Sequence, residues 1–240
     1  MKVQPTDLER LLTIQEYDSA VVALKHQAAV APIHARIKAL AQDRTTVGDR
    51  LIAARTTLSD AEQAVVRAEA DVEPVRQRLA RNQARVDAGE MDAKALATAV
   101  DEIAHLKTRV SDLEDAELAA IDAVDLATAT VAALTGEAAT VETDLTQALA
   151  TRDADMAELV DQALQIELKR ADLARDIAPD LLGLYDKIRA RAGGIGVARF
   201  EGRRCLGCAL EATVVDFNRY SAAPADELIR CAECDRILVR

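Results

Sequence analysis

The stretch Val86-Asp87-Ala88-Gly89-Glu90-Met91-Asp92-Ala93 separates two long heptad patterns of apolar residues. Gly89 is suited to end a helix because glycine adopts the left-handed backbone conformation at little cost. Asp92 is suited to cap the next helix because its carboxylate can accept a hydrogen bond from a free backbone amide. The stretch therefore predicts a turn at residues 87–92 between two long helices.

Apolar residues recur in steps of four and three on both sides of this turn. From Ile33 to Val86, 14 of the 16 heptad positions are apolar, and from Leu96 to Ala148 the count is 15 of 16. Such a pattern marks the buried seam of a coiled coil. Folding the chain about Gly89 places residue 86 beside 92 and residue 33 beside 145, so the two seams match. The sequence predicts a mainly α fold with an antiparallel coiled-coil hairpin over residues 1–178.

Both seams lose their register at the same level of this hairpin. Pro32 interrupts the first helical pattern, and beyond Ala148 the second seam reaches Arg152 and Asp155. A proline removes a helical hydrogen bond, and a register shift changes the face that is buried. We expect a joint near residues 28–34 and 146–155. The alternative is a change of register that the helices absorb without bending.

The composition is that of long helices. Aromatic residues make up 2% of the 240 residues, tryptophan is absent, and the formal net charge is −11. Residues 1–182 hold 20 basic and 33 acidic side chains, whereas residues 183–240 hold 10 and 8. The helical segment should therefore repel nucleic acid. No run of 18 apolar residues and no signal peptide is present, so we expect a cytoplasmic protein without a membrane span.

The only four cysteines form two C-x-x-C pairs separated by 22 residues, at Cys205, Cys208, Cys231 and Cys234. Two such pairs are typical ligands of one tetrahedral zinc ion. We predict one structural zinc and a small zinc ribbon over residues 195–240. Four thiolates leave no open position for water, so this site would stabilise a fold and not catalyse a reaction. The alternative is free thiols or adventitious disulfides.

Short elements are expected between the hairpin and the last cysteine. Residues 179–194 are predicted to be a short helix and linker, ended by the cluster Gly193-Gly-Ile-Gly196. Strands are expected at residues 197–200, 213–215, 227–230 and 237–239. Phe217 and Tyr220 either stack on nucleic-acid bases or fill a small core.

The chain resembles bacterial C4-type zinc-ribbon proteins with an N-terminal coiled coil. The resemblance rests on the hairpin followed by Leu184-Tyr185, Cys205-x-Gly-Cys208 and Ile229-Arg230-Cys231-x-x-Cys234-x-Arg236. It implies a non-enzymatic adaptor; some members resemble flagellar regulators that bind an alternative sigma factor and a messenger RNA, and others are linked to secretion chaperoning. Asp235 stands where the family often has glycine, and aspartate tolerates the left-handed conformation better than most residues.

A first basic cluster flanks the first cysteine pair. With Glu201 as the only acid from residue 187 to 204, it comprises Lys187, Arg189, Arg191, Arg199, Arg203 and Arg204. Zinc ribbons often use such surfaces for nucleic acid or for polymerase-type partners. The alternative is that these side chains complement a helix C-terminus and the solvent.

A second basic cluster lies near the predicted turn, at Arg76, Arg78, Arg81 and Arg85. A positive tip on an acidic hairpin could dock a phosphate backbone or an acidic protein surface. The alternative is ion pairing across the hairpin with Glu90, Asp92, Asp101 or Glu102. These four arginines form a tip patch that is a candidate partner site.

Two functional hypotheses follow from the sequence. In the first, the protein is a zinc-binding adaptor whose coiled coil binds a protein partner, while the ribbon recognises protein or nucleic acid in transcriptional or post-transcriptional regulation. In the second, it binds RNA or DNA directly through residues 187–204. No combination of nucleophile and base suggests an enzyme, and the internally satisfied seam favours a monomer or a weak dimer.

Overall fold

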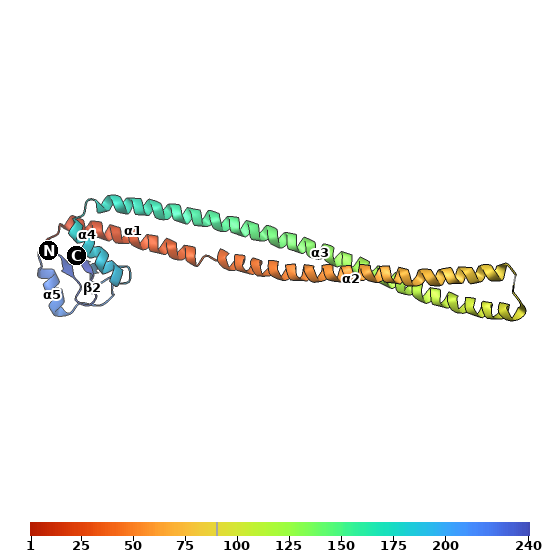
Figure 1. Ribbon diagram of the computed structural model, residues 1–240. Coiled ribbons are helices and arrows are strands. Elements are labelled where there is room, and N and C mark those ends of the chain that lie inside the picture. The colour runs from red at the N-terminus through yellow and green to blue at the C-terminus, as the bar shows by residue number, and fades with distance from the viewer. Residues whose placement is uncertain (90) are drawn as a thin grey trace. The chain divides into compact units, whose positions relative to one another are not determined.

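The computed structural model describes residues 1–89 and 91–240. It is mainly helical, with a small C-terminal strand region (Figure 1). By contacts the chain divides into two compact units, Arg36–Leu149 and the combination of Met1–Ala35 with Ala150–Arg240. In chain order the elements are α1 (Pro5–Ala29), α2 (Ile33–Asp87), α3 (Ala93–Ala174), α4 (Pro179–Arg191), β1 (Val197–Glu201), β2 (Arg204–Cys205), α5 (Val214–Ala222), β3 (Ile229–Arg230) and β4 (Ile237–Val239).

The unit Arg36–Leu149 is the body of a long helical hairpin. α2 and α3 run side by side in it (Figure 1). Every buried residue of these two helices occupies a position of the predicted seams, as Val47, Val72, Leu113 and Leu134 illustrate. The predicted fold class is therefore confirmed, since burial follows the heptad pattern as it does in coiled coils.

The pairing of the two helices is offset from a simple fold about Gly89. Arg50 bonds Glu137 at 3.1 Å, and Arg44 bonds Glu142 at 3.0 Å. The predicted register places residue 134 opposite Arg44 and residue 128 opposite Arg50, so the expected register is wrong there by about two helical turns. A shift of this size preserves the apolar seams, because moving one helix by a heptad superimposes equivalent positions. Nearer the turn, Arg78 pairs with Glu102, two residues from its predicted partner.

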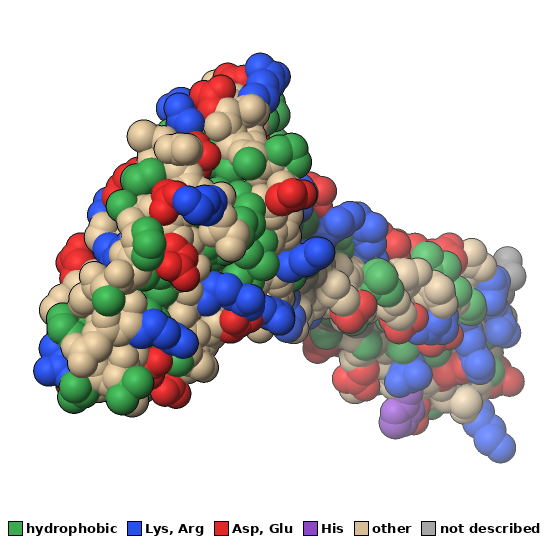
Figure 2. Space-filling model, turned by 90° about the vertical axis from the view of Figure 1, so that its left-hand side faces the viewer, with side chains coloured by type: hydrophobic (Ala, Val, Ile, Leu, Met, Phe, Trp, Pro, Cys, Tyr) green, Lys and Arg blue, Asp and Glu red, His purple; other side chains and the backbone are tan. Residues whose placement is uncertain are grey.

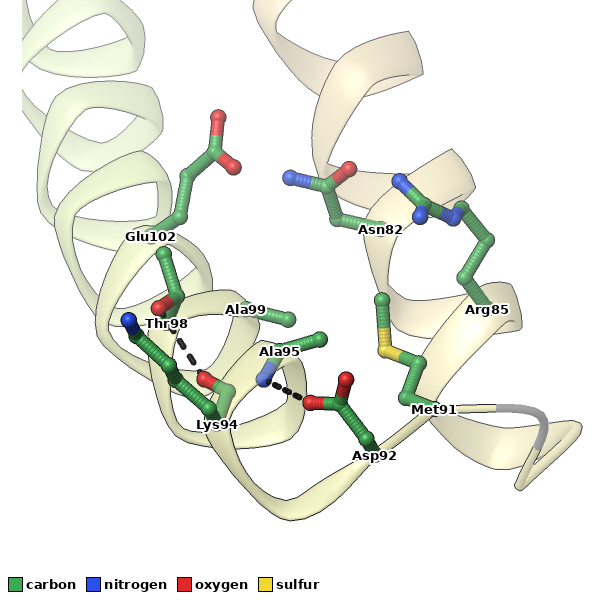
Figure 3. A pocket seen from close by; sticks show the side chains of 9 residues that line it. All are labelled: Asn82, Arg85, Met91, Asp92, Lys94, Ala95, Thr98, Ala99 and Glu102. Atoms are coloured by element: carbon green, nitrogen blue, oxygen red, sulfur yellow. Dashed lines mark hydrogen bonds between the residues drawn. The ribbon is translucent and has the colours of Figure 1, made fainter.

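The turn has the local structure that its residues predict. Gly89 has a φ of +67°. One Asp92 carboxylate oxygen accepts a hydrogen bond of 2.8 Å from the Ala95 amide, which caps the start of α3 (Figure 3). Gly89 and Asp92 therefore end one helix and begin the next as expected.

The helical path is interrupted at Pro32 on one side only. α1 ends at Ala29, and α2 begins at Ile33. The His34 ring lies 2.9 Å from the Ala28 carbonyl oxygen and spans this break. α3 is helical throughout residues 146–155, where the other half of the expected joint was placed.

The unit of the two chain ends has a core that α1, α4 and the strands share. Leu11, Ile14, Leu181, Ile188 and Ile237 are fully buried in it. The four strands form one sheet in the order β2-β1-β4-β3, with β1 and β4 parallel. The N-terminus pairs with the segment just before β3, since the amide of Leu228 donates to the carbonyl of Met1 at 3.1 Å. Both termini therefore lie together (Figure 1).

Residues 213–215 are not a strand, and that expectation was wrong. Val214–Ala222 form α5, and the Thr213 hydroxyl accepts a hydrogen bond of 3.1 Å from the Asp216 amide. This is an N-terminal cap, and it outweighs the β propensity of the two valines that follow it. Val214 and Val215 are exposed, so their β propensity is not reinforced by burial against a sheet. The strands expected near 197–200, 227–230 and 237–239 are present as β1, β3 and β4.

One part of α3 is unusually apolar. An 18-residue window of this helix has a mean hydropathy of 1.5, and 11% of the window is buried. By length and composition alone the helix could cross a membrane. A single helix of this kind is weak evidence for a membrane span, because core helices of soluble proteins and signal sequences have the same length and hydropathy. The absence of a membrane span stays a prediction.

Candidate metal centre and surrounding surfaces

The four cysteines lie in one cluster. Their sulfur atoms are all within 4.8 Å of one another. Sγ of Cys205 is 3.9 Å from that of Cys234, and Sγ of Cys208 is 4.0 Å from that of Cys231. Four thiolates around one tetrahedral zinc would be separated by about 3.8 Å, given metal–sulfur bonds of about 2.3 Å. All four thiols are free, and the arrangement fits a single tetrahedral metal ion.

Both C-x-x-C segments form the same tight turn. The amide of Ala209 donates to the carbonyl of Cys205 at 2.8 Å, and the amide of Asp235 donates to that of Cys231 at 2.9 Å. Ala209 and Asp235 have φ values of +60° and +65°. The left-handed conformation expected for Asp235 is confirmed. Two equivalent turns place four sulfur atoms around one point.

Backbone amides within the turns donate to the buried thiols. Burial raises the pKa of Cys205 to about 12, and the amides of Gly207 and Cys208 oppose this rise. Burial also raises the pKa of Cys231, against the amides of Glu233 and Cys234. At Cys234 burial is outweighed by hydrogen bonds, first from the Arg236 amide, and the pKa is lowered. A metal must displace protons from these thiols, so its affinity should rise with pH.

Gly207 is required by close packing and not by its backbone conformation. A Cβ atom at this position would lie 2.7 Å from Cδ of Arg236 and 2.9 Å from Cβ of Ala198. Arg236 in turn donates to the carbonyl of Ile195 at 3.0 Å, which connects the second cysteine turn to the linker before β1.

Gly207→Ala is expected to lower the free energy of unfolding of the C-terminal region by about 1–3 kcal/mol, because the added methyl group overpacks this contact. Thermal unfolding of the metal-loaded protein measures the change. Gly48→Ala is the matched control, since nothing lies within 4 Å of its added Cβ and alanine favours the helix. Equal destabilisation by both substitutions would contradict the packing role of Gly207.

The aromatic residues of the tail form a small core beside the cysteines. Tyr220 is 2% exposed, and its ring meets Phe200 edge-on with centroids 5.3 Å apart. The Tyr220 hydroxyl accepts a hydrogen bond of 2.9 Å from the amide of Ala232, inside the second cysteine turn. For Tyr220 the geometry favours core filling, because a buried ring cannot stack on a base, whereas Phe217 is half-buried and lies beneath the Arg203 guanidinium.

Most of the first basic cluster is paired with acidic side chains. Arg199 bonds Glu9 at 2.9 Å, Arg203 lies 3.7 Å from Glu211, and Arg191 pairs with Asp235. On the face shown in Figure 2, basic and acidic side chains are interspersed.

Of the remaining members of this cluster, Arg189 is half-buried, and Lys187 and Arg204 are exposed. Nε of Arg189 is 3.4 Å from Oδ2 of Asp18, although the geometry does not make a hydrogen bond. Within residues 1–89 and 91–240, Lys187 and Arg204 are exposed and have no ion pair. The free positive charge at this surface is thus smaller than the sequence suggests.

The second basic cluster is also partly paired across the hairpin. Arg76 bonds Glu114 at 2.7 Å, and Arg78 pairs with Glu102. Arg85 and Asn82 line an open hollow of about 400 Å³ beside the turn (Figure 3). Arg81 is exposed, and Glu90, one of the acids considered as a partner, lies outside the described residues.

A buried polar network, which the sequence did not reveal, holds α1 against α4. Oδ2 of Asp18 accepts from the Tyr185 hydroxyl at 2.7 Å, and Oδ1 accepts from Nε of Arg170 at 2.8 Å. Gln15 accepts from the Gly196 amide at 2.7 Å. Burial and the neighbouring Asp18 raise the pKa of Tyr185, so this hydroxyl remains a donor. The network fixes the linker that leads into β1.

Residues 14–193 match the family model of the CT398-like coiled coil hairpin domain. The chain belongs to this family. CT398 itself, from Chlamydia trachomatis, has a solved structure that aligns over 97% of both chains with a TM-score of 0.65 and 15% identity. The HP0958 protein from Helicobacter pylori aligns over 97% of this chain and 96% of its own with a TM-score of 0.51, also at 15% identity. At this identity the likeness concerns the fold alone.

Mycobacterial relatives of this CT398-like chain are similar over all or most of its length. A structure from Mycobacterium smegmatis covers 100% of both chains with a TM-score of 0.83 and 30% identity. The Rv2229c protein of Mycobacterium tuberculosis is 31% identical over 100% of this chain and 98% of its own length. The ML1638 protein of Mycobacterium leprae is 28% identical over 93% and 96%. The family model ends at residue 193, before the first cysteine.

Proposed function

We propose that this CT398-like protein is a non-enzymatic, zinc-binding adaptor of the cytoplasm. In this proposal the coiled coil binds a protein partner. One structural zinc holds residues 195–240 as a ribbon that presents a recognition surface for transcriptional or post-transcriptional regulation. The observation that carries the proposal is the cluster of four sulfur atoms within 4.8 Å of one another, in a segment that follows the helical hairpin in the chain.

The chemistry of the cluster supports a structural role for the metal. Four thiolates satisfy the tetrahedral coordination that zinc prefers, and iron is the other common metal for this donor set. A zinc ion with four cysteine ligands has no position left for water or substrate. Its binding free energy would instead stabilise the small core around Cys205 and Tyr220, which few apolar contacts would otherwise hold.

The charge distribution favours a protein partner over nucleic acid. Four members of the first basic cluster contact acids, as at Arg199 and Glu9. A nucleic acid would have to compete with these pairs and approach a segment whose 33 acids outnumber its 20 basic residues. Direct RNA or DNA binding would therefore rest on Lys187 and Arg204 alone.

The adaptor proposal is tested by chemical cross-linking in lysate followed by mass spectrometry, with the wild-type chain and a Cys205→Ser variant. The wild type should capture a defined protein that the variant loses. Lys187→Ala with Arg204→Ala, which changes exposed side chains only, separates loss of a surface from loss of the fold. Retention of one RNA by the wild type at about 150 mM salt, lost in this double variant, would favour the nucleic-acid alternative.

A further inference from the structure

An apolar groove lies between α1 and α3. It encloses about 310 Å³. Apart from a lysine and a glutamate its lining is entirely apolar. The larger part of this apolar lining comes from Leu24, Ala28, Met156, Leu159, Val160 and Leu164. All of them belong to the unit that contains both chain ends. The ribbons of α1 and α3 are well separated over this stretch (Figure 1).

At this groove α1 and α3 do not bury their apolar side chains against each other. The last buried residue of α1 is Val21, and α3 has none after Ala148. Val160 is 68% exposed, and Leu164 is 49% exposed. An unpartnered set of large aliphatic side chains is costly in water, because water around apolar surface is unfavourable. Such a surface marks an interaction site.

A second hollow extends the groove toward the break at Pro32. It encloses about 400 Å³ and shares Met156 and Leu159 with the first. Together the two hollows follow α3 from Asp155 to Glu167. At 1.5 Å per residue this distance is roughly 18 Å, which accommodates about three turns of a helix.

The rim of the extended groove is acidic at its Pro32 end. Asp155 and Glu158 line it there, and both are exposed. Among the ion pairs of the described residues, neither carboxylate has a cationic partner. At the other end Lys25 and Glu167 are 3.8 Å apart, and both are exposed to solvent. The free charge of the rim is therefore negative.

We propose that this groove binds an amphipathic helix of another protein, one that carries an apolar stripe and lysine or arginine residues beside it. The proposal rests on the adaptor function and names the chemistry of its protein partner. Helices dock into such grooves through apolar residues spaced three and four apart. Basic side chains at the partner's flank would meet Asp155 and Glu158.

The charge of the chain argues against a second copy as the occupant. The net charge of −11 gives a second copy the same sign of charge, on average, as the acidic rim. Like charges brought together cost free energy and slow association. A basic helix gains from the same field, so charge complementarity selects it.

The binding test uses a fluorescein-labelled 14-residue helical peptide of leucine and lysine in a heptad pattern, titrated with the metal-loaded full chain by fluorescence anisotropy. The same peptide with glutamate in place of lysine, and a scrambled leucine–lysine peptide, are the comparison probes. We expect saturable binding of the basic amphipathic peptide and at least tenfold weaker binding of the other two.

Two variants locate the peptide. Leu164→Gln with Val160→Gln should weaken binding by about tenfold or more, because it removes two exposed apolar contacts. Asp155→Asn with Glu158→Gln should weaken it severalfold and flatten its salt dependence. Leu126→Gln, at a position 72% exposed on the hairpin body, is the matched control and should leave the affinity unchanged.

Equal affinity of the wild type and the Leu164→Gln, Val160→Gln variant would overturn the proposal, as would equal binding of the glutamate peptide. A concentration-dependent dimer in analytical ultracentrifugation that the same substitutions abolish would assign the groove to a second copy and also overturn it. If the wild-type chain binds none of the peptides but still captures a partner in a way that depends on Cys205, the proposed role of the groove is refuted. The adaptor function would then still stand.

Discussion

Cys205→Ser is expected to abolish binding of one metal ion and to unfold residues 195–240, while the helical hairpin stays folded. Cys205 is 2% exposed and is part of the small core that includes Tyr220. Structural zinc sites contribute apparent binding free energies of about 10–16 kcal/mol, which a core of this size cannot replace. The hairpin should be unaffected because its buried residues lie in the seams of α2 and α3.

Native mass spectrometry measures the metal content, and limited proteolysis measures the order of residues 195–240. Far-UV circular dichroism should change little, since most helical residues are outside this region. Glu233→Gln is the matched control because this exposed side chain lies inside the second cysteine turn and is not a ligand. A Cys205→Ser protein that retains one metal ion and the same resistance to protease would refute the structural role.

Asp18→Ala is expected to lower the free energy of unfolding of the unit that holds the chain ends by about 3–5 kcal/mol, because it leaves buried partners uncompensated. Asp18 is 7% exposed. It accepts hydrogen bonds from Tyr185 at 2.7 Å and from Arg170 at 2.8 Å. Tyr185→Phe removes only the hydroxyl and should cost about 1 kcal/mol, because Oδ2 of Asp18 keeps its hydrogen bond of 3.4 Å from Arg170.

Urea unfolding at constant metal saturation measures these differences, and hydrogen exchange of residues 10–20 and 185–197 locates them. Glu16→Ala is the control, since Glu16 is exposed on the same helix and should change stability by less than about 0.5 kcal/mol. If Asp18→Ala proves as stable as Glu16→Ala, the network does not hold α1 against α4.

The long helices and their turn could be predicted because their signals are local and repeated. Heptads identify a buried face without any knowledge of the partner helix, and every buried residue of α2 and α3 lies in the predicted seams. The register between the helices was not predictable in the same way. A heptad shift leaves the seam intact, so the offset is seen only in contacts between the helices, such as the ion pairs of Arg44 with Glu142 and Arg50 with Glu137.

The cysteine cluster was predictable for a similar reason. Two C-x-x-C pairs encode two identical turns, and the left-handed Asp235 followed from its position after the last cysteine. The helix at Val214–Ala222 had a signal that valine content obscured, namely Thr213 followed by Asp216 at the spacing of a helix cap. A capping hydrogen bond at one position thus outweighed the average propensity of its neighbours.

The sequence by itself determined the helices, the turn at Gly89 and the four sulfur ligands, because each depends on residues close together in the chain. Only the tertiary structure decided which charges remain free and which apolar faces remain open. Arg199 is neutralised by Glu9, 190 residues away, and Asp18 is buried by Tyr185, 167 residues away. The apolar face of residues 156–164 stays open because α1 does not cover it. Such outcomes depend on packing between residues far apart in the chain, and periodicity and spacing carry no information about it.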